Sequence, residues 1–494
     1  MSTIAGPVPQ FHSRQKESLQ AWPEWLTLAG YAALLAFAIP YHEPWADEAQ
    51  AWQLARSVPL RDLFRHYLRY EGSPGLWHLL LALLARLHVS YTGMHWVAGA
   101  IACAGIALLV FCAPFPRSIR LVLPFTFFLA FQYAVVARSY VLVPSLLFAI
   151  AALWRRNPIA VAVLLGLLGN VALHALAISG GMALLYLLVR CNHVARRTLL
   201  LCTLLLAAFY AFALWTVAPK PADLAFESWP AAARSWQFKL LAFSLRSIAS
   251  ILTPIIQPVL LAIPLWYLFI RRFLTARRTV YLLPILTFAL FGGYYATFWH
   301  SGLVIPTAIA VCWITWEPIA PRRLGTATTV TGYCVLALQV AWTVHAVAFD
   351  HDQAYSGDQQ AAAFLAPYAA RHQTMAVTYF QHKELNAFHS IGLAPYFDHP
   401  IFLNQPRPFW FWQNQENTPA QFQAAMLRHP VIIDAMLFQV QGIDPSRDPS
   451  DLPLTSQLRA QDYTLTHTFC GEKPEGFRQR ERICHVIFQQ AAQP

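Results

Sequence analysis

The stretch from Pro158 to Arg190, PIAVAVLLGLLGNVALHALAISGGMALLYLLVR, has no charged residue before its last position. Its length exceeds one untilted transmembrane helix, which needs about 20 apolar residues. Asn170, His174 and the Gly180–Gly181 pair interrupt the apolar run, so we divide it near His174 into two short spans. The stretch therefore predicts a chain that crosses a membrane more than once.

The composition indicates the same class. Hydrophobic residues make up 57% of the 494 residues and charged residues only 12%, against about 25% charged in soluble domains. This excludes a soluble enzyme and a disordered chain. Nine further apolar runs bring the expected fold to an all-α polytopic membrane protein of about eleven spans: Trp22–Pro40, Gly93–Ala113, Ile119–Val136, Tyr140–Trp154, Leu199–Val217, Leu240–Ile270, Val280–Phe298, Leu303–Glu317 and Leu324–Ala348.

Basic residues form clusters on alternate connections between these runs, and not one patch, so we do not expect nucleic-acid binding. Because Lys and Arg in short loops gather on the cytoplasmic side, the N-terminal tail 1–21 is expected there, ahead of a membrane module at 22–348. The first loop, 41–92, and the region 349–494 then lie outside the cytoplasm. The clusters are Arg14/Lys16, Arg117/Arg120, Arg155/Arg156, Arg190/Arg196/Arg197, Arg271/Arg272/Arg277/Arg278 and Arg322/Arg323.

One apolar segment, Pro74–Leu87, does not fit this count. It has only 14 residues, and counting it as a span would put Arg clusters on both sides of the membrane. We expect a re-entrant or interfacial helix there, with a short true span as the alternative.

The region 349–494 returns to ordinary polarity and predicts a small α/β domain. Helix-like stretches alternate there with strand-like runs: Asp358–Ala370 and Pro419–Arg428, then Met375–Tyr379, Val431–Ile433, Tyr463–Phe469 and Cys484–Phe488. Cys470 and Cys484 are the only cysteines of this region and are consistent with a disulfide in an oxidising compartment. Two unrelated thiols are the alternative.

The loop 41–92 holds the densest polar chemistry of the membrane part. Asp47 can cap a first amphipathic helix and Pro59 opens a second, and we expect both helices to lie flat on the membrane. The adjacent carboxylates Asp47 and Glu48 suit general-base chemistry on a substrate held partly in lipid. The alternative is that these acids only complement the helix dipole.

Four basic side chains are predicted at the extracytoplasmic level of the membrane: Arg138, His174, Arg246 and His300. Charges in lipid are costly and mark functional sites by default, and a phosphate group is a plausible partner for them. Each also has a structural interpretation. Arg138 can snorkel to the surface, His174 can cap a turn, Arg246 can pair with Asp223 or Glu227, and His300 can be an interface residue.

The first loop resembles that of a known superfamily. An Asp-Glu pair just after the first span, followed by Glu71-Gly72-Ser73-Pro74-Gly75-Leu76-Trp77, is similar to the GT-C glycosyltransferases that use polyprenyl-phosphate sugars. These include protein O-mannosyltransferases and lipid A aminoarabinose transferases. The resemblance includes Arg138-Ser139-Tyr140 and His174, and it extends over the membrane part of the chain, about residues 20–350. Gly72 and Ser73 stand where the aminoarabinose transferases have a Lys before paired prolines.

The resemblance implies transfer of a sugar, with inversion, from a polyprenyl-phosphate donor to a hydroxyl of a glycan, lipid or protein acceptor. It implies Asp47 as the base, with Glu48 next, and Arg138 with Arg246 or His300 on the donor phosphate. The residues expected to bind the substrate are those in or beside the motifs that carry the resemblance: His174, Glu71 and Tyr140. The resemblance implies no definite cofactor. It leaves open whether a divalent metal helps to stabilise the donor phosphate. A bacterial inner membrane is the expected location.

Two other functions fit the same sequence. A transporter or flippase of lipid-linked sugars would also need a basic membrane cavity, but would be expected to have intramembrane acids and internal repeats. A non-catalytic scaffold for envelope assembly would not need Asp47. Activity after an Asp47→Asn substitution separates the three hypotheses.

Overall fold

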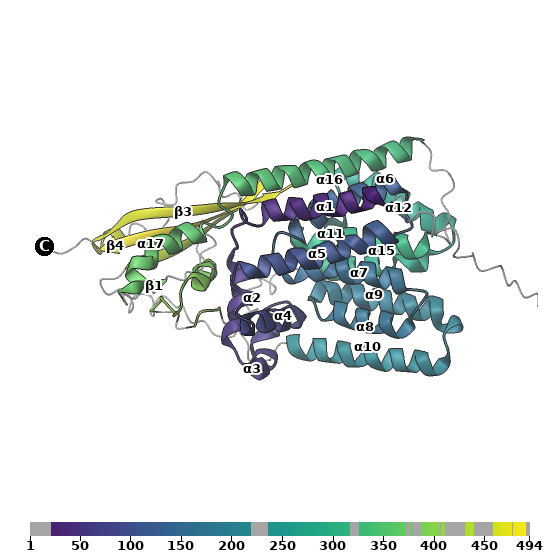
Figure 1. Cartoon of the computed structure of the whole chain (residues 1–494), viewed down its shortest axis with the longest axis horizontal. Coiled ribbons are helices and arrows are strands. Elements are labelled where there is room, and N and C mark those ends of the chain that lie inside the picture. The colour runs from purple at the N-terminus through teal and green to yellow at the C-terminus, as the bar shows by residue number, and fades with distance from the viewer. Residues whose placement is uncertain are drawn as a thin grey trace, which may run out of the picture.

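The computed structural model describes residues 21–218, 236–316, 326–371, 376–377, 387–403, 405, 407–410, 430–438, 458–476 and 478–490. The N-terminal tail up to residue 20, the helix-like stretch Pro419–Arg428 and the arginines Arg322 and Arg323 lie outside these residues. The described chain forms a bundle of helices with a sheet-containing domain at one end (Figure 1).

The bundle is built from apolar helices, most of which run along the long axis of the molecule. Among the described residues, five helices are long and apolar enough to cross a membrane: Gly93–Cys112, Leu173–His193, Arg196–Val217, Phe298–Thr315 and Thr329–Asp352. Four shorter apolar helices accompany them: Leu76–Arg86, Ser139–Leu153, Pro158–Gly169 and Thr279–Tyr294. The chain is therefore a membrane protein by helix length and composition.

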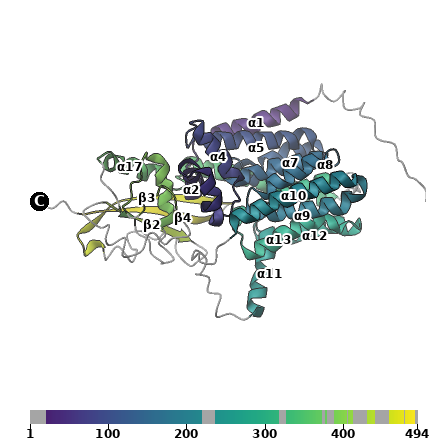
Figure 2. The ribbon, with the colours of Figure 1, turned by 90° about the horizontal axis from the view of Figure 1, so that it is seen from below.

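Figure 1 labels most of the bundle helices, and Figure 2 also labels α13. Their bounds in the bundle are α1 Trp22–Ala38, α5 Gly93–Cys112, α6 Arg117–Val122, α7 Leu142–Leu153, α8 Pro158–Gly169, α9 Leu173–Arg190, α10 Arg196–Val217, α11 Trp236–Leu252, α12 Ala262–Thr275, α13 Leu283–Tyr294, α14 Phe298–Ser301, α15 Val304–Thr315 and α16 Thr326–Asp352.

The long run 158–190 is divided, as the sequence suggests, into α8 and α9. The break falls at Asn170, whose side-chain Nδ2 donates to the carbonyls of Gly166 and Phe209. This amide satisfies a carbonyl at the end of α8 and also ties that end to Phe209 on α10.

Two expected spans are not single helices. The run Leu240–Ile270 forms α11 and α12, because Pro254 and Pro258 lie in the break and lack the N–H that a continuous helix needs. Figure 2 shows α11 running across the direction of the other bundle helices. The run Ile119–Val136 forms α6, a 3-10 turn at Leu123–Phe125 and a π-helical turn at Phe128–Gln132. Its side chains from Phe127 to Ala137 are buried, as irregular backbone at membrane depth requires.

The first loop forms α2 (Ala46–Ser57), α3 (Leu60–Arg65), a 3-10 turn at Tyr67–Tyr70 and α4 (Leu76–Arg86). The expected surface position of the first helix is wrong: nearly all of α2 is buried, from Glu48 to Ala55. It packs against α4 and against the 3-10 segment η11 (Ala387–Tyr396) of the C-terminal domain. Its N-cap is Trp45, so Asp47 is the second helical residue and not the cap.

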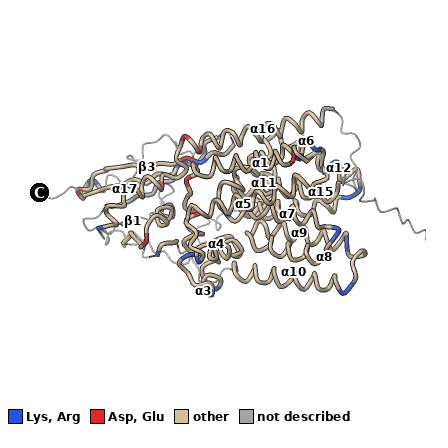
Figure 3. Tube along the Cα trace, viewed as in Figure 1, with Lys and Arg blue, Asp and Glu red and all other residues tan. Residues whose placement is uncertain are grey.

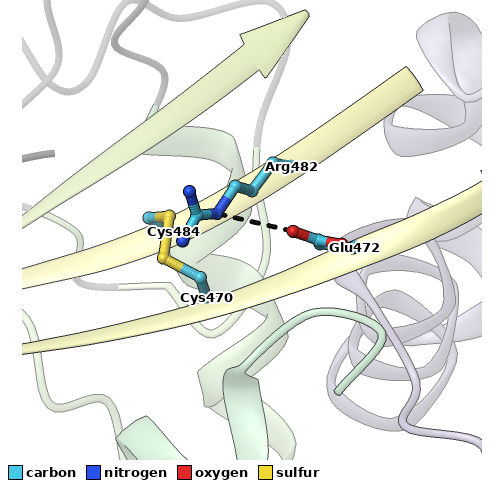
Figure 4. Close-up of a disulfide and its surroundings, with 4 residues drawn as sticks. All are labelled: Cys470, Glu472, Arg482 and Cys484. Atoms are coloured by element: carbon cyan, nitrogen blue, oxygen red, sulfur yellow. Dashed lines mark ion pairs between the residues drawn. A yellow bond between two sulfur atoms is a disulfide. The ribbon is translucent and has the colours of Figure 1, made fainter. Parts of the chain in front are cut away.

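The C-terminal domain holds a four-stranded sheet in the order β1-β2-β4-β3. The short β1 (Ala376–Val377) is parallel to β2 (Val431–Phe438), and β4 (Arg478–Gln490) is antiparallel to β2 and to β3 (Tyr463–Glu475). The helix α17 has the expected bounds, Asp358–Ala370. Cys470 on β3 and Cys484 on β4 are opposite each other and form a disulfide (Figure 4).

The carboxylate of Glu43 joins the domain to the bundle. It accepts hydrogen bonds from the backbone N–H groups of Ser356, Gly357 and Gln359 at 2.6–3.0 Å, where α17 begins. The backbone N–H of Glu472 on β3 also donates to the carbonyl of Ala354. These contacts hold the end of the β3–β4 hairpin against the loop that precedes α2.

Charge is distributed unevenly along the molecule. In Figure 3, Lys and Arg mark the end of the bundle farthest from the sheet, near α6, α12 and the adjacent ends of α8 and α10. Another basic group surrounds α3, whose Arg61 and Arg65 are exposed. Acidic residues lie mostly where the bundle meets the C-terminal domain.

Candidate active site

An ion pair between Asp47 and Arg138 lies where the bundle meets the C-terminal domain. Arg138 Nη2 is 2.9 Å from Asp47 Oδ2, and the two side chains are 17% and 26% exposed. Asp47 is fixed by the first turn of α2, and Arg138 precedes the 3-10 turn Ser139–Val141 with an extended backbone. Solvent or a substrate can therefore reach both groups.

Arg138 is surrounded by three aromatic rings. Its guanidinium carbon lies 5.4 Å from the ring centre of Trp45, 5.3 Å from that of Tyr140 and 5.9 Å from that of Trp299. Such contacts stabilise a cation without using its N–H donors. Arg138 Nη1 is buried and has no hydrogen-bond partner among the residues that the structure describes. The guanidinium therefore keeps donors for an anion.

A second cation reaches Trp45 from the C-terminal domain. Lys473, near the end of β3, is buried, and its Nζ lies 2.6 Å from the ring centre of Trp45. Trp45 thus contacts cations from both parts of the molecule. The sequence contains no signal for this residue, because Lys473 lies 335 positions from Arg138 in an ordinary polar hairpin.

His174 and His300 form the wall next to Arg138. Their rings are stacked at 4.2 Å, and the ring of His300 lies 5.3 Å from Tyr140. His174 Nε2 is 2.7 Å from the carbonyl of Tyr295, and His300 Nδ1 is 2.7 Å from the hydroxyl of Thr297. The structure therefore brings three of the predicted site residues together beside the ion pair.

Glu48 differs completely from its neighbour Asp47. It is fully buried, and its oxygens face His42 Nε2 at 3.3 Å and His95 Nε2 at 3.0 Å. It also accepts hydrogen bonds from the backbone N–H groups of Trp45 and Ala137. Burial alone would raise the pKa of Glu48, but His42 and His95 outweigh it and hold that pKa well below its usual range.

Two other predicted residues lie apart from the ion pair. Glu71 accepts a hydrogen bond from Gln50 Nε2 at 2.8 Å, and Gln50 also bonds the backbone of Trp410 in the C-terminal domain. Arg246 is exposed on α11, which packs against α13 and contacts α14. Neither side chain belongs to the aromatic group around Arg138.

A scan of the chain against protein-family models finds no match, and a search of the curated proteins finds no similar sequence. The function is therefore inferred from the residues and the geometry of the site.

Proposed function

We propose that this protein is a membrane glycosyltransferase that moves a sugar from a polyprenyl-phosphate donor to an acceptor hydroxyl outside the cytoplasm. The observation that carries the proposal is the partly exposed Asp47–Arg138 pair, set among aromatic rings at one end of an apolar helix bundle. A carboxylate and a guanidinium side by side are what a reaction needs when it removes a proton and releases a phosphate.

The roles follow from charge. The acceptor oxygen attacks the anomeric carbon from the face opposite the phosphate, and Asp47 takes the hydroxyl proton. The bond between the anomeric carbon and the phosphate oxygen breaks, and the polyprenyl phosphate leaves with the electron pair. Arg138, assisted by Lys473, stabilises this leaving phosphate, and the stacked rings of His174 and His300 bound the space beside it.

The ion pair itself supports this division of roles. While Arg138 is bonded to Asp47, the guanidinium occupies a carboxylate oxygen that an acceptor hydroxyl would otherwise meet. A donor phosphate competes for the guanidinium, because phosphate is a strong partner for the planar fork of Arg. Donor binding then releases Asp47 to meet the acceptor.

Asp47 is a better base than Glu48. Glu48 is fully buried and both its oxygens already accept hydrogen bonds, whereas one side of Asp47 is open to solvent. Glu48 therefore serves to hold the site in shape.

The basic residues at the far end of the bundle support a cytoplasmic location for that end. The disulfide between Cys470 and Cys484 supports an oxidising compartment for the C-terminal domain. The site then lies at the extracytoplasmic face, where lipid-linked sugars and their acceptors meet.

The test is an assay for free polyprenyl phosphate by mass spectrometry. Purified protein in lipid nanodiscs is incubated with a panel of polyprenyl-phosphate sugars and an envelope extract that supplies acceptors. Wild-type protein should release the lipid phosphate and Asp47→Asn should do so about 10²–10⁴-fold more slowly, with donor binding retained. Asp62→Asn, on α3, is the matched control and should keep the wild-type rate.

The assay also separates the rival functions. Movement of donor across a bilayer by wild-type protein, without any release of lipid phosphate, would identify a transporter or flippase. Equal rates for Asp47→Asn and wild-type protein would remove Asp47 from the proposal.

A further inference from the structure

A second polar cluster lies behind Asp47, inside the protein. His42, Glu48 and His95 are 6%, 0% and 2% exposed, and their ligand-type atoms all lie within 4.8 Å of one another. They come from the loop after α1, the first turn of α2 and the first turn of α5. Glu48 lies between the two imidazoles, each of which points its Nε2 at a carboxylate oxygen.

The donor atoms are near the spacing of a metal site. Ligands about 2.1 Å from a tetrahedral ion are about 3.4 Å apart, and Glu48 lies 3.3 Å from His42 Nε2 and 3.0 Å from His95 Nε2. The ligand atoms of all three residues lie within 4.8 Å of one another, so binding requires them to draw closer around the ion. Two His nitrogens and one carboxylate form a ligand set that zinc uses in proteins.

A fourth residue completes the pattern. Asp350, at the end of α16, lies 2.8 Å from His42 Nδ1. A metal-bound imidazole typically donates its other ring N–H to a carboxylate, which fixes the tautomer and the ring orientation. Asp350 thus leaves His42 Nε2 as the nitrogen that faces the cluster.

The charges of the cluster also fit a dication. Two buried carboxylates, those of Glu48 and Asp350, lie against His42. A divalent ion bound to two neutral imidazoles would balance both, which matters where charges are out of water.

We infer that His42, Glu48 and His95 form a binding site for one divalent transition-metal ion of the zinc class, with Asp350 orienting His42. Hard cations such as Mg²⁺ and Ca²⁺ prefer all-oxygen sites, so they are not the expected occupants. On binding, each Nε2 gives a lone pair to the metal, and any proton that it carried passes to solvent or to the other nitrogen of the same ring.

The metal would act on the candidate active site through Glu48. The carboxylate that binds the metal also accepts the backbone N–H of Ala137 at 2.7 Å, next to Arg138. It likewise fixes the first turn of α2, which carries Asp47. The ion is thus a positioning element that joins α2, α5 and α16, and the inference does not depend on the reaction proposed above.

The test begins with the wild-type membrane protein, purified in detergent without chelator. We expect about one zinc per chain by elemental mass spectrometry, or binding of one added Zn²⁺ with sub-micromolar affinity. Cobalt(II) added to chelator-treated protein should give the visible absorption of a four-coordinate ion with nitrogen and oxygen ligands. These measurements need no variant and no activity.

Variants then locate the ion. His95→Gln should lower the zinc affinity at least 100-fold, while His78→Gln should leave it unchanged. His78 is a matched control because it is buried on α4 and neither ring nitrogen has a hydrogen-bond partner in the described part of the chain. Wild-type protein that binds neither Zn²⁺ nor Co²⁺ would overturn the inference, and so would a His95→Gln variant with unchanged affinity.

Discussion

The two sides of the first turn of α2 serve opposite purposes. On one side Asp47 is 26% exposed and bonded to a single partner, Arg138. On the other side Glu48 is fully buried and has four hydrogen-bond partners. Because neighbouring helical residues point about 100° apart, one acidic dipeptide can supply a reactive carboxylate and a structural one. Adjacent acids in a sequence therefore need not share a role.

The buried side should carry the largest stability effect. Glu48→Gln removes the charge between His42 and His95 and leaves their N–H groups poorly paired, so we expect a loss of about 3–5 kcal/mol. Chemical or thermal unfolding in detergent measures it, with Asp62→Asn as the control. Wild-type stability in Glu48→Gln would mean that the buried cluster contributes nothing to the fold.

The exposed side should carry the largest effect on rate. Arg138→Ala removes the cation that we propose stabilises the leaving phosphate, and should slow lipid-phosphate release about 10²–10³-fold. Arg138→Lys keeps the charge without the planar fork and should retain part of the activity. Arg246→Ala is the informative comparison: a loss as large as that of Arg138→Ala would move the phosphate site towards α11.

Stability measured as a function of pH tests the buried side of the first turn of α2. His42 has a folded pKa of about 10 and a usual pKa of 6.5, so its contribution to stability is complete below pH 6.5 and is lost as the pH rises to 10. Metal-free protein, kept in chelator, should therefore become less stable over that range. The same series on His42→Gln should be flatter, and parallel curves for the two proteins would contradict the assignment.

The smallest expected effect is that of Asp47→Asn on stability. The ion pair is partly exposed, and such pairs contribute about 0–1 kcal/mol. Unfolding under the conditions used for Glu48→Gln should show a change of that size or less. A loss comparable with that of Glu48→Gln would mean that Asp47 is also a structural residue, and it would blur the contrast between the two sides.

The sequence predicted helix positions best where long apolar runs are interrupted by a polar residue. It placed the division of 158–190 within a few residues of Asn170, because a side chain that caps a helix end is visible in the sequence. It failed at Leu240–Ile270, where two prolines inside an apolar run separate α11 from α12. Hydropathy averages over such residues, whereas the backbone responds to each missing N–H.

The candidate site was predicted in part. The sequence places several polar residues at the same depth in the membrane, and the structure brings five of them close together: Asp47, Arg138, Tyr140, His174 and His300. The roles of Glu48 and Lys473 could not be read, since they depend on burial and on a hairpin from the other end of the chain. The surface position expected for α2 was wrong for the same reason: its cover, η11, comes from a distant part of the sequence.

The hydrogen bonds of Glu43 have a consequence for how the protein is made. Its partners, Ser356, Gly357 and Gln359, are translated more than 300 residues after it. Asp350 and Lys473 also belong to the last third of the chain. The ribosome thus delivers the bundle helices up to α15 before the groups that complete the two polar clusters. A nascent chain in the membrane therefore has unfinished clusters, which are complete only when the C-terminal domain has folded onto the loop before α2.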